Sequence, residues 1–523
     1  GVAALPDTGD YAWNPLAQEN SQWIGVLLWL LAAQVMGLLA LPIVLAVFRN
    51  LPDRGYGFAK LVGLLLVSWG VWILASVRLA PFTVWTILLV LALMALLSAL
   101  CWRLGAGVAI REFWAKQRGL ILFYELLFFV AFAAFLFIRL LNPDIWQPFN
   151  GGEKPMEFGF LNSILRSPWM PPADPFFSDG YVNYYYHGLF VMACLIKLVG
   201  ADPALAFNYA VPLLYALTFV AAASVVYNIV AWSQRRRGST HAVSRSGLVF
   251  GALAGVLMIV IGNMQAFWQW LMIQFPTLSG DLVRWASSVG FTEGSILGES
   301  TRRAFDFWGP SRILSGTINE FPFWAFLFSD LHPHLIDIPF TLVAVGLAIN
   351  LALTRPFGPA RTKLVEAAYP DWVQRGRVRI TSSLGWLWGD GWTGVLTFAV
   401  TALTLGALIV INSWDYPTYL ALVGGAVLIA VLRLRSRADD DDEEGAPAAG
   451  TAPAGLTTGP RWSVYLASVA SLGALAGIAL FLYLPFFLNF KAFFTKINPL
   501  VDGGIIPGTT ERMYRTHLPE FLV

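Results

Sequence analysis

The residue types best suited to acid–base chemistry gather in the polar segment 142–182, which interrupts long apolar stretches. Asp144 and Glu153 can share one pocket, in which one carboxylate acts as a catalytic base and the other orients it. Lys154 follows Glu153 and can neutralise a phosphate group as a point charge. Local roles compete with this interpretation, because Asp144 can pair with Arg139 or cap a helix, and Glu153 can pair with Lys154 on the surface.

A second group of polar residues comes just before an apolar stretch that begins at residue 335. Asp330, His332 and His334 alternate there, and alternate residues of an extended segment project to one side. Pro333 favours an extended conformation for the residue before it. Two histidines and a carboxylate can bind a divalent cation or relay protons. We therefore expect a divalent metal, Mg²⁺ or Mn²⁺, at these three residues and no other cofactor.

The tyrosine triplet Tyr184-Tyr185-Tyr186 and the following His187 lead into a short apolar segment. Tyrosines at a membrane boundary usually belong to the aromatic belt. Three in a row cannot all face lipid, because successive helical residues are about 100° apart. At least one is expected to point into the protein or toward a substrate. His187 can bind phosphate or a metal there, or be a hydrogen-bonded structural histidine.

Other connections carry groups that can hold an anionic substrate. Asp415 lies in the tight turn 412–417, where it can reach the same cavity or make a local Asx hydrogen bond. Arg302, Arg303 and Arg312 can clamp a phosphate or pyrophosphate, or contact lipid phosphates.

The composition is that of a membrane protein. The 523 residues are 57% hydrophobic and 13% charged, whereas soluble domains carry about 25% charged residues. Apolar runs of about 20 residues recur, each long enough to cross a bilayer as a helix. A β-barrel would show alternating segments of about ten residues instead. We therefore predict an all-α, polytopic transmembrane protein of about 10–12 spans.

Several function classes have no support. The net charge of +2 gives no reason to expect nucleic acid as a partner. The chain has no P-loop, no GxGxxG fingerprint and no HExxH motif, so nucleotide hydrolysis and dinucleotide chemistry are not indicated. Cys101 and Cys194 lie inside apolar runs and are expected to be buried free thiols.

The distribution of Lys and Arg predicts the orientation. Five connections carry most of the basic residues and are placed in the cytoplasm by the positive-inside rule: 49–60, 103–118, 233–245, 355–379 and 433–437. The segments with the polar motifs then face outward: 142–182, 274–334, 412–416 and 487–523. We expect a multi-pass protein of the cytoplasmic membrane whose active loops lie outside.

The predicted spans are 23–48, 59–79, 82–102, 119–141, 203–232, 246–273, 335–354, 393–413, 417–433 and 463–486. The passage from 142–182 outside to 233–245 inside requires an odd number of crossings. Either the short segment 183–199 enters without crossing, or 203–232 breaks near Pro212. Non-helical backbone at membrane depth is tolerated where it lines a cavity.

Four segments are expected along the chain. Residues 1–118 form N-terminal transmembrane helices, 119–433 the core with the outer loops, and 462–523 a final helix and an outer tail. Between them, 434–461 contains an acidic run followed by Ala, Gly, Pro and Thr, which is typical of a disordered cytoplasmic loop.

The motifs together resemble those of a bacterial and archaeal membrane family known for its tyrosine triplet, the YYY-domain or DUF2298 proteins. The resemblance rests on segments between residues 120 and 420: Glu153-Lys154-Pro155-Met156, Asn162-Ser163, Pro171-Pro172-Ala173-Asp174-Pro175, Tyr184-Tyr185-Tyr186, Asn319-Glu320-Phe321-Pro322-Phe323, Asp330-Leu331-His332-Pro333-His334 and Asn412-Ser413-Trp414-Asp415. The family name implies no established activity.

A looser resemblance is to the GT-C superfamily of integral-membrane glycosyltransferases. In those enzymes a membrane helix leads into a large first outer loop that bears a catalytic acid and interfacial helices, and an aromatic-rich helix then re-enters the membrane. The resemblance implies that Asp144 or Glu153 is the catalytic carboxylate. Their separation by nine positions departs from the common Asp-Glu pairing and leaves open which of them it is.

The sequence therefore favours a glycosyltransferase whose donor is a sugar linked to polyprenyl phosphate. Membrane lipids and this donor are the expected partners. A transporter or flippase for a lipid-linked or anionic substrate, and a structural subunit of a membrane complex, remain alternative hypotheses.

Overall fold

The computed structural model describes residues 11–18, 21–146, 152–177, 180–262, 265–275, 307–311, 319–354, 388–389, 391–443 and 463–490. Within these ranges the regular secondary structure is helical, and the β-type pairing is a single isolated bridge between Ala173 and Tyr181. The predicted all-α fold is confirmed.

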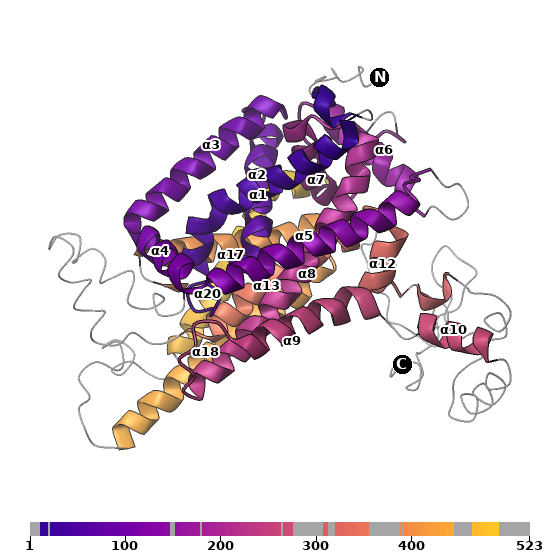
Figure 1. The fold of residues 1–523 in the computed structure, drawn as a ribbon. Coiled ribbons are helices and arrows are strands. Elements are labelled where there is room, and N and C mark those ends of the chain that lie inside the picture. Colours follow the sequence, from indigo (N-terminus) through magenta and orange to yellow (C-terminus); the bar gives the residue numbers. More distant parts are fainter. Residues whose placement is uncertain are drawn as a thin grey trace, which may run out of the picture. The chain divides into compact units, whose positions relative to one another are not determined.

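The helices follow one another along the chain as Figure 1 shows. Those before residue 240 are α1 (Gln22–Val47), α2 (Ala59–Ser76), α3 (Val84–Cys101), α4 (Gly107–Lys116), α5 (Arg118–Leu141), α6 (Lys154–Arg166), α7 (His187–Val199) and α8 (Pro203–Arg236). The later ones are α9 (Arg245–Val256), α10 (Gln265–Gln274), α12 (Pro322–Phe328), α13 (Pro333–Ala352), α17 (Gly391–Asn412), α18 (Asp415–Glu443), α20 (Ser463–Leu482) and α21 (Leu484–Asn489). Short 3₁₀ segments are η1 (Pro15–Ala17), η3 (Tyr56–Phe58) and η7 (Gly309–Ser311), and π segments are η4 (Trp102–Ala106) and η5 (Leu257–Ile261).

The chain divides into two compact units. The larger unit comprises the described residues of 1–255 and 331–490, and the smaller one those of 256–330. The division follows packing, so the four functional segments expected from the sequence stay a prediction.

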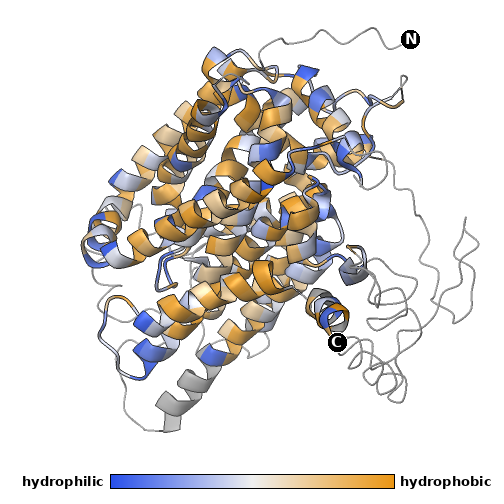
Figure 2. Ribbon diagram, turned by 45° about the vertical axis from the view of Figure 1, so that its right-hand side comes forward, coloured by the Kyte–Doolittle hydropathy of each residue, from blue (hydrophilic) through white to orange (hydrophobic). Residues whose placement is uncertain are grey.

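Eight helical segments of the described chain are long and apolar enough to cross a membrane: Gln22–Val47, Tyr56–Ser76, Val84–Lys116, Arg118–Leu141, Pro203–Arg236, Pro333–Ala352, Gly391–Asn412 and Asp415–Arg433. Hydrophobic residues predominate along these helices, and hydrophilic residues are more frequent at helix ends and in connections (Figure 2). The chain is therefore polytopic, as predicted.

The helices α7 and α8 decide between the two predicted paths at residues 183–232. α8 is continuous over 34 residues with Pro212 inside it, so it does not break there. α7 has 13 residues, which gives a length of about 20 Å, short of the roughly 30 Å of hydrocarbon in a bilayer. The short segment is thus the one that does not form a full span.

Two predicted elements differ from the structure. The expected span 246–273 is interrupted, because α9 and η5 end at Gly262, which has φ 59° and ψ −146°. Glycine adopts such a backbone conformation without a steric penalty. The expected disordered segment 434–461 is helical at its start, because α18 continues to Glu443, and its remainder lies outside the described residues. Extending an existing helix costs much less than starting one.

Close packing of α1 on α2 depends on a glycine. A Cβ atom at Gly63 would lie 2.4 Å from the carbonyl oxygen of Met36, so no larger residue fits between the two backbones. Small residues at such contacts let membrane helices approach each other.

An ion pair between two spanning helices joins α2 to α5. Lys60 Nζ lies 2.7 Å from Glu125 Oε1, and the two side chains are 13% and 17% exposed. Tyr56 donates to the same oxygen at 2.9 Å, and Gln34 of α1 donates to the other at 2.7 Å. Charged residues in membrane helices are rare and usually paired. Three helices therefore meet at one carboxylate.

Breaking this pair on one side is expected to destabilise the protein. Either Lys60→Met or Glu125→Gln leaves one partner uncompensated and should lower the free energy of unfolding by about 3 kcal/mol. The double variant should recover most of that loss. Thermal unfolding in detergent measures the cycle, and Lys116→Met, which breaks the exposed Lys116–Glu112 pair, should have a much smaller effect, because water and salt screen exposed ion pairs. Equal losses at both pairs would contradict this interpretation.

Candidate functional site

The helix α6 has two glutamates at its start, Glu153 as the N-cap residue and Glu157 in the first turn. It begins beside Gly152, which has φ 60°, and has Pro155 in its first turn, where a missing N–H costs no hydrogen bond. Phe160, Ile164 and Leu165 of α6 are buried in the protein. The apolar face of α6 is thus fixed by protein packing, which determines where the acids at its start must point.

Two glutamates of this first turn meet a histidine from the beginning of α13. His332 Nδ1 lies 2.9 Å from Glu153 Oε2 and 3.0 Å from Glu157 Oε1. One potential ligand atom from each of the three residues lies within 4.8 Å of those from the other two. We call Glu153, Glu157 and His332 the Glu–His cluster.

The three members differ in exposure. Glu157 is completely buried, whereas the side chains of His332 and Glu153 are 25% and 52% exposed. The second carboxyl oxygen of Glu157, Oε2, is also buried and has no hydrogen-bond partner in the described part of the chain. A buried carboxyl oxygen without a donor is costly unless a proton or a cation satisfies it.

The two glutamates are tuned in opposite directions. The hydrogen bond with His332 is the largest cause that lowers the pKa of Glu153. Burial raises the pKa of Glu157, and the contact with His332 offsets only part of that effect. Neighbouring carboxyl groups whose pKa values are pushed apart are typical of acid–base sites.

The same ligand types can hold a divalent cation. Two carboxylates and one imidazole form a mixed oxygen and nitrogen set, which suits borderline metals better than a site of oxygen atoms alone would. The orphaned Oε2 of Glu157 fits such a role, because it is an acceptor that the protein leaves unsatisfied.

The predicted metal set is arranged differently from the expectation. His332 has the expected extended backbone, but α13 starts at Pro333, so His334 is helical and the alternation stops. The His332 and His334 rings remain neighbours at 4.8 Å. Asp330 is buried at the end of the smaller unit, and it does not belong to the ligand group found among the described residues.

The predicted carboxylate Asp144 lies in a local turn. It is exposed, and its Oδ1 accepts a hydrogen bond from the backbone N–H of Trp146 at 2.8 Å. Arg139 donates to Asn208 from α8, at 3.0 Å from Nε. The contact of Asp144 is thus a local turn, whereas the alternatives considered from the sequence were a pair with Arg139 or a helix cap. Lys154 is buried in the first turn of α6, beside Glu153.

The three tyrosines of the triplet each contact a different part of the protein, and one of them contacts α6. Tyr186 is 2% exposed and accepts a hydrogen bond from Trp72 at 3.1 Å, so at least one tyrosine points inward as expected. Tyr184 packs on the ring of Phe160 of α6, with ring centroids 5.8 Å apart. Tyr185 shares a hydrogen bond of 2.9 Å with Ser413 in the α17–α18 turn.

His187 is completely buried next to Trp72, Phe190 and Tyr483. Neither of its ring nitrogens has a hydrogen-bond partner in the described residues. Its neighbours among the described residues are thus aromatic, and its predicted role in phosphate binding stays a prediction.

Asp415 is the first residue of α18 and accepts a hydrogen bond from Asn412 at 2.7 Å. This is the local turn that the sequence allowed as an alternative. The predicted phosphate contacts Arg302, Arg303 and Arg312 lie outside the described residues.

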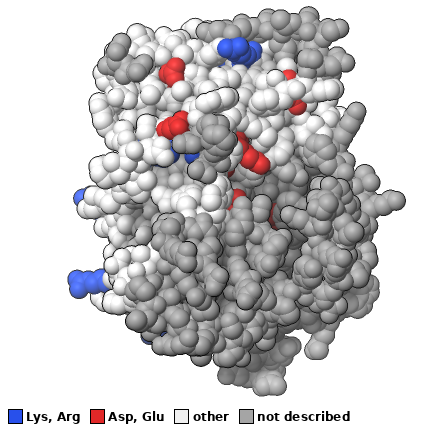
Figure 3. Space-filling view, turned by 90° about the vertical axis from the view of Figure 1, so that its right-hand side faces the viewer, with Lys and Arg blue, Asp and Glu red and all other residues white. Residues whose placement is uncertain are grey.

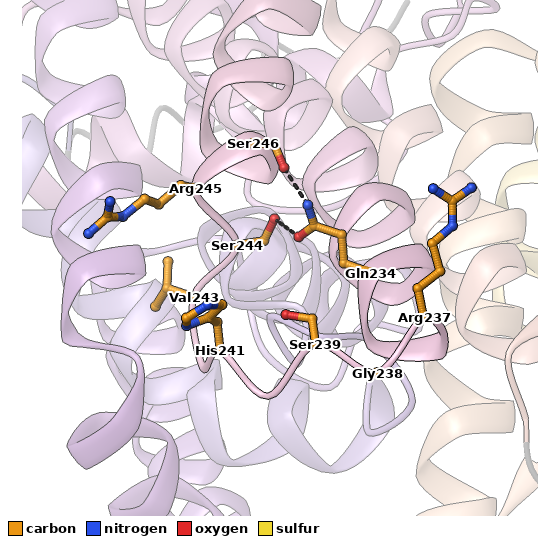
Figure 4. A pocket seen from close by; sticks show the side chains of 9 residues that line it. All are labelled: Gln234, Arg237, Gly238, Ser239, His241, Val243, Ser244, Arg245 and Ser246. Atoms are coloured by element: carbon orange, nitrogen blue, oxygen red, sulfur yellow. Dashed lines mark hydrogen bonds between the residues drawn. The ribbon is translucent and has the colours of Figure 1, made fainter.

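On the face shown in Figure 3, the charged side chains of the described residues occupy a few separate spots among uncharged ones. A separate pocket of about 630 Å³ lies between the end of α8 and the start of α9, and is lined by Gln234, Arg237, Gly238, Ser239, His241, Val243, Ser244, Arg245 and Ser246. Gln234 bridges Ser244 and Ser246 across it at 2.6 Å each, while the two arginines extend in opposite directions (Figure 4). This pocket belongs to the connection 233–245, which the sequence predicts to be cytoplasmic, and it contains no member of the Glu–His cluster.

Glu157 is the functional residue that the sequence analysis missed. A signal was present, since Glu153 and Glu157 are four residues apart and such a spacing puts two side chains on one helix face. Glu153 was instead paired with Asp144, because both lie in the irregular part of the loop.

The family model described as "Uncharacterized membrane protein (DUF2298)" matches residues 66–523, a range that includes the whole Glu–His cluster. The family resemblance drawn from the tyrosine triplet is confirmed. No curated protein and no solved structure matches the chain.

The opposite pKa shifts of the two glutamates predict opposite effects on stability in chelator-treated protein. Glu157 has a raised pKa, so its contribution is present at low pH and is lost as the pH rises above its ordinary value of 4.5. Glu157→Gln should therefore flatten the fall in melting temperature between about pH 5 and about pH 7. Glu153 has a lowered pKa, so Glu153→Gln should flatten the fall on the acid side of about pH 4.5 instead. Melting curves across pH test both, and flattening on the same side in both variants would refute the assignment.

Proposed function

The chain belongs to the DUF2298 family of membrane proteins, and we propose that it is an integral-membrane glycosyltransferase that uses a sugar linked to polyprenyl phosphate. The observation that carries the proposal is the convergence of Glu153, Glu157 and His332 on one another, from a loop helix and from the start of a membrane helix. A lipid-linked donor suits a chain without a nucleotide-binding motif, because its tail stays in the bilayer while its phosphate reaches the loop.

In such a transfer an acceptor hydroxyl attacks the anomeric carbon of the donor. The bond between that carbon and the phosphate oxygen breaks, and the hydroxyl proton passes to a base. Glu153 suits the role of base, because its pKa is lowered and its side chain is half exposed. His332 orients Glu153, and the buried Glu157 holds His332 from the other side. A divalent cation, when bound, would supply positive charge for the departing phosphate.

Substitutions in the Glu–His cluster are expected to remove most of the activity. Glu153→Gln and His332→Gln should each slow transfer by about 10²–10⁴-fold, because each removes the base or the group that orients it. The assay is release of polyprenyl phosphate from synthetic polyprenyl-phosphate hexoses by purified protein, with a membrane extract supplying acceptors. Asp144→Asn and Glu112→Gln, two exposed acids outside the cluster, serve as controls and should retain activity.

The alternative hypotheses predict different results when the wild type and these variants are reconstituted in vesicles that contain the labelled donor. A transporter would move the labelled donor across the bilayer without cleaving it. A structural subunit would tolerate all four substitutions. Full release activity in both cluster variants would overturn the proposal.

The cation is tested without an activity assay. Mn²⁺ titrated into purified, chelator-treated protein and followed by electron paramagnetic resonance should bind, and Glu157→Gln should weaken binding at least about tenfold. Asp330→Asn is the matched comparison, because that residue belongs to the set predicted from sequence and not to the Glu–His cluster. A loss of Mn²⁺ binding in Asp330→Asn alone would show that the originally predicted set is the metal site.

A further inference from the structure

A second buried acid lies on α13, one helical turn and a half after His332. Asp337 is 0% exposed, and both of its carboxyl oxygens are buried without a protein donor among the described residues. It has no part in the Glu–His cluster. A carboxyl group in such surroundings needs a partner, because an isolated buried carboxylate is strongly unfavourable.

The neighbour of Asp337 is another carboxyl group. Asp415, the first residue of α18, interacts directly with it. Asp415 is half-buried, and its Oδ2 accepts the amide hydrogen bond from Asn412 of α17 at 2.7 Å. The two acids therefore stand in unequal surroundings: one has a donor and partial access to solvent, and the other has neither.

Two further titratable groups lie near Asp337. Tyr419, one turn further along α18, interacts with both acids and with Thr341 of α13. His334 lies one turn before Asp337 on its own helix. Among the described residues, no lysine or arginine acts on the Asp337 carboxyl group.

Two adjacent carboxylates in a low-dielectric site cannot both be ionised. We propose that Asp337 carries a proton at neutral pH and donates it in a hydrogen bond to ionised Asp415, so that the two acids form a proton-binding site between α13 and α18. Asp415 is the ionised member, since Asn412 already donates to it. The single proton then provides a hydrogen-bond partner for one carboxyl oxygen of Asp337 and one of Asp415.

The Asp337–Asp415 pair connects α13 with the start of α18. α13 begins immediately after His332. The α17–α18 turn that contains Asp415 is also held by the hydrogen bond between Ser413 and Tyr185. Asp337 is therefore a positioning residue, and loss of its proton would place two like charges between α13 and α18 and push them apart. The inference does not depend on the proposed transferase activity.

Infrared difference spectroscopy of the purified protein tests the proton directly. The wild type at neutral pH should show a carbonyl band of a protonated carboxylic acid that is absent in Asp337→Asn. Asp415→Asn should shift the frequency of that band, because the acceptor changes from a carboxylate to an amide. Asp144→Asn, which replaces an exposed aspartate, is the control and should leave the band unchanged.

Thermal unfolding separates a proton link from plain packing. Asp337→Asn keeps a hydrogen-bond donor of the same size, so it should unfold near the wild-type temperature at neutral pH, whereas Asp337→Leu should unfold well below it. Relative to Asp337→Asn, the wild type should lose stability as the pH rises above about 4, because an unfolded chain releases an aspartate proton there while the native wild type retains it.

Three results would overturn the proposal. The first is a neutral-pH spectrum in which Asp337→Asn removes no carboxylic acid band. The second is equal destabilisation by Asn and Leu at position 337. The third is a wild-type melting temperature that rises with Na⁺ or K⁺ at constant ionic strength while Asp337→Asn does not respond, which would identify a metal cation in place of the proton.

Discussion

The contact of one imidazole with two glutamates is the interaction on which the arrangement of α6 and the start of α13 depends. Glu157 is completely buried, and a carboxyl group is taken out of water only where another group offsets the lost hydration. His332 is that group, at 3.0 Å. α6 is in turn held by its apolar face, on which Ile164 and Leu165 are also completely buried. The packing that places α6 therefore also determines the environment of Glu157.

The aromatic residues around this contact act as its support. Trp72 donates to Tyr186, and Tyr184 packs on Phe160 of α6. The ring of Tyr185 stacks on Phe490, with centroids 5.7 Å apart. Rigid rings with one polar atom each can fix the position of a helix at low cost in conformational entropy. The conspicuous triplet thus has a clear packing role, whereas its predicted role in substrate binding is still untested.

Much of the fold could be predicted from local sequence, because a bilayer imposes a length and a polarity on every span. The expected spans 23–48 and 335–354 agree closely with α1 and α13. Gly262 was not recognised as an interruption, since a single glycine inside an apolar run leaves hydropathy nearly unchanged. The site was harder to predict. Glu157 and His332 are 175 positions apart, and only the packing of α6 on the protein brings them together. Local pattern selected both Glu153 and His332, but it paired Glu153 with Asp144 and grouped His332 with Asp330 and His334. The structure instead brings Glu153 and His332 together with Glu157.

The short helix α7 has a consequence for how the protein is made. Every residue of α7 except Leu198 is buried, and its neighbours include α1, α2, α13 and α17. Two of these neighbours are synthesised long after α7 leaves the ribosome. Lys197, within its last turn, donates to the carbonyl oxygen of Phe82 at 2.8 Å, a partner that is available early. A helix that is too short to span and carries a lysine cannot rest alone in lipid. We therefore expect α7 to pack first against α1, α2 and the carbonyl group of Phe82, and to be enclosed by α13 and α17 after these have been synthesised.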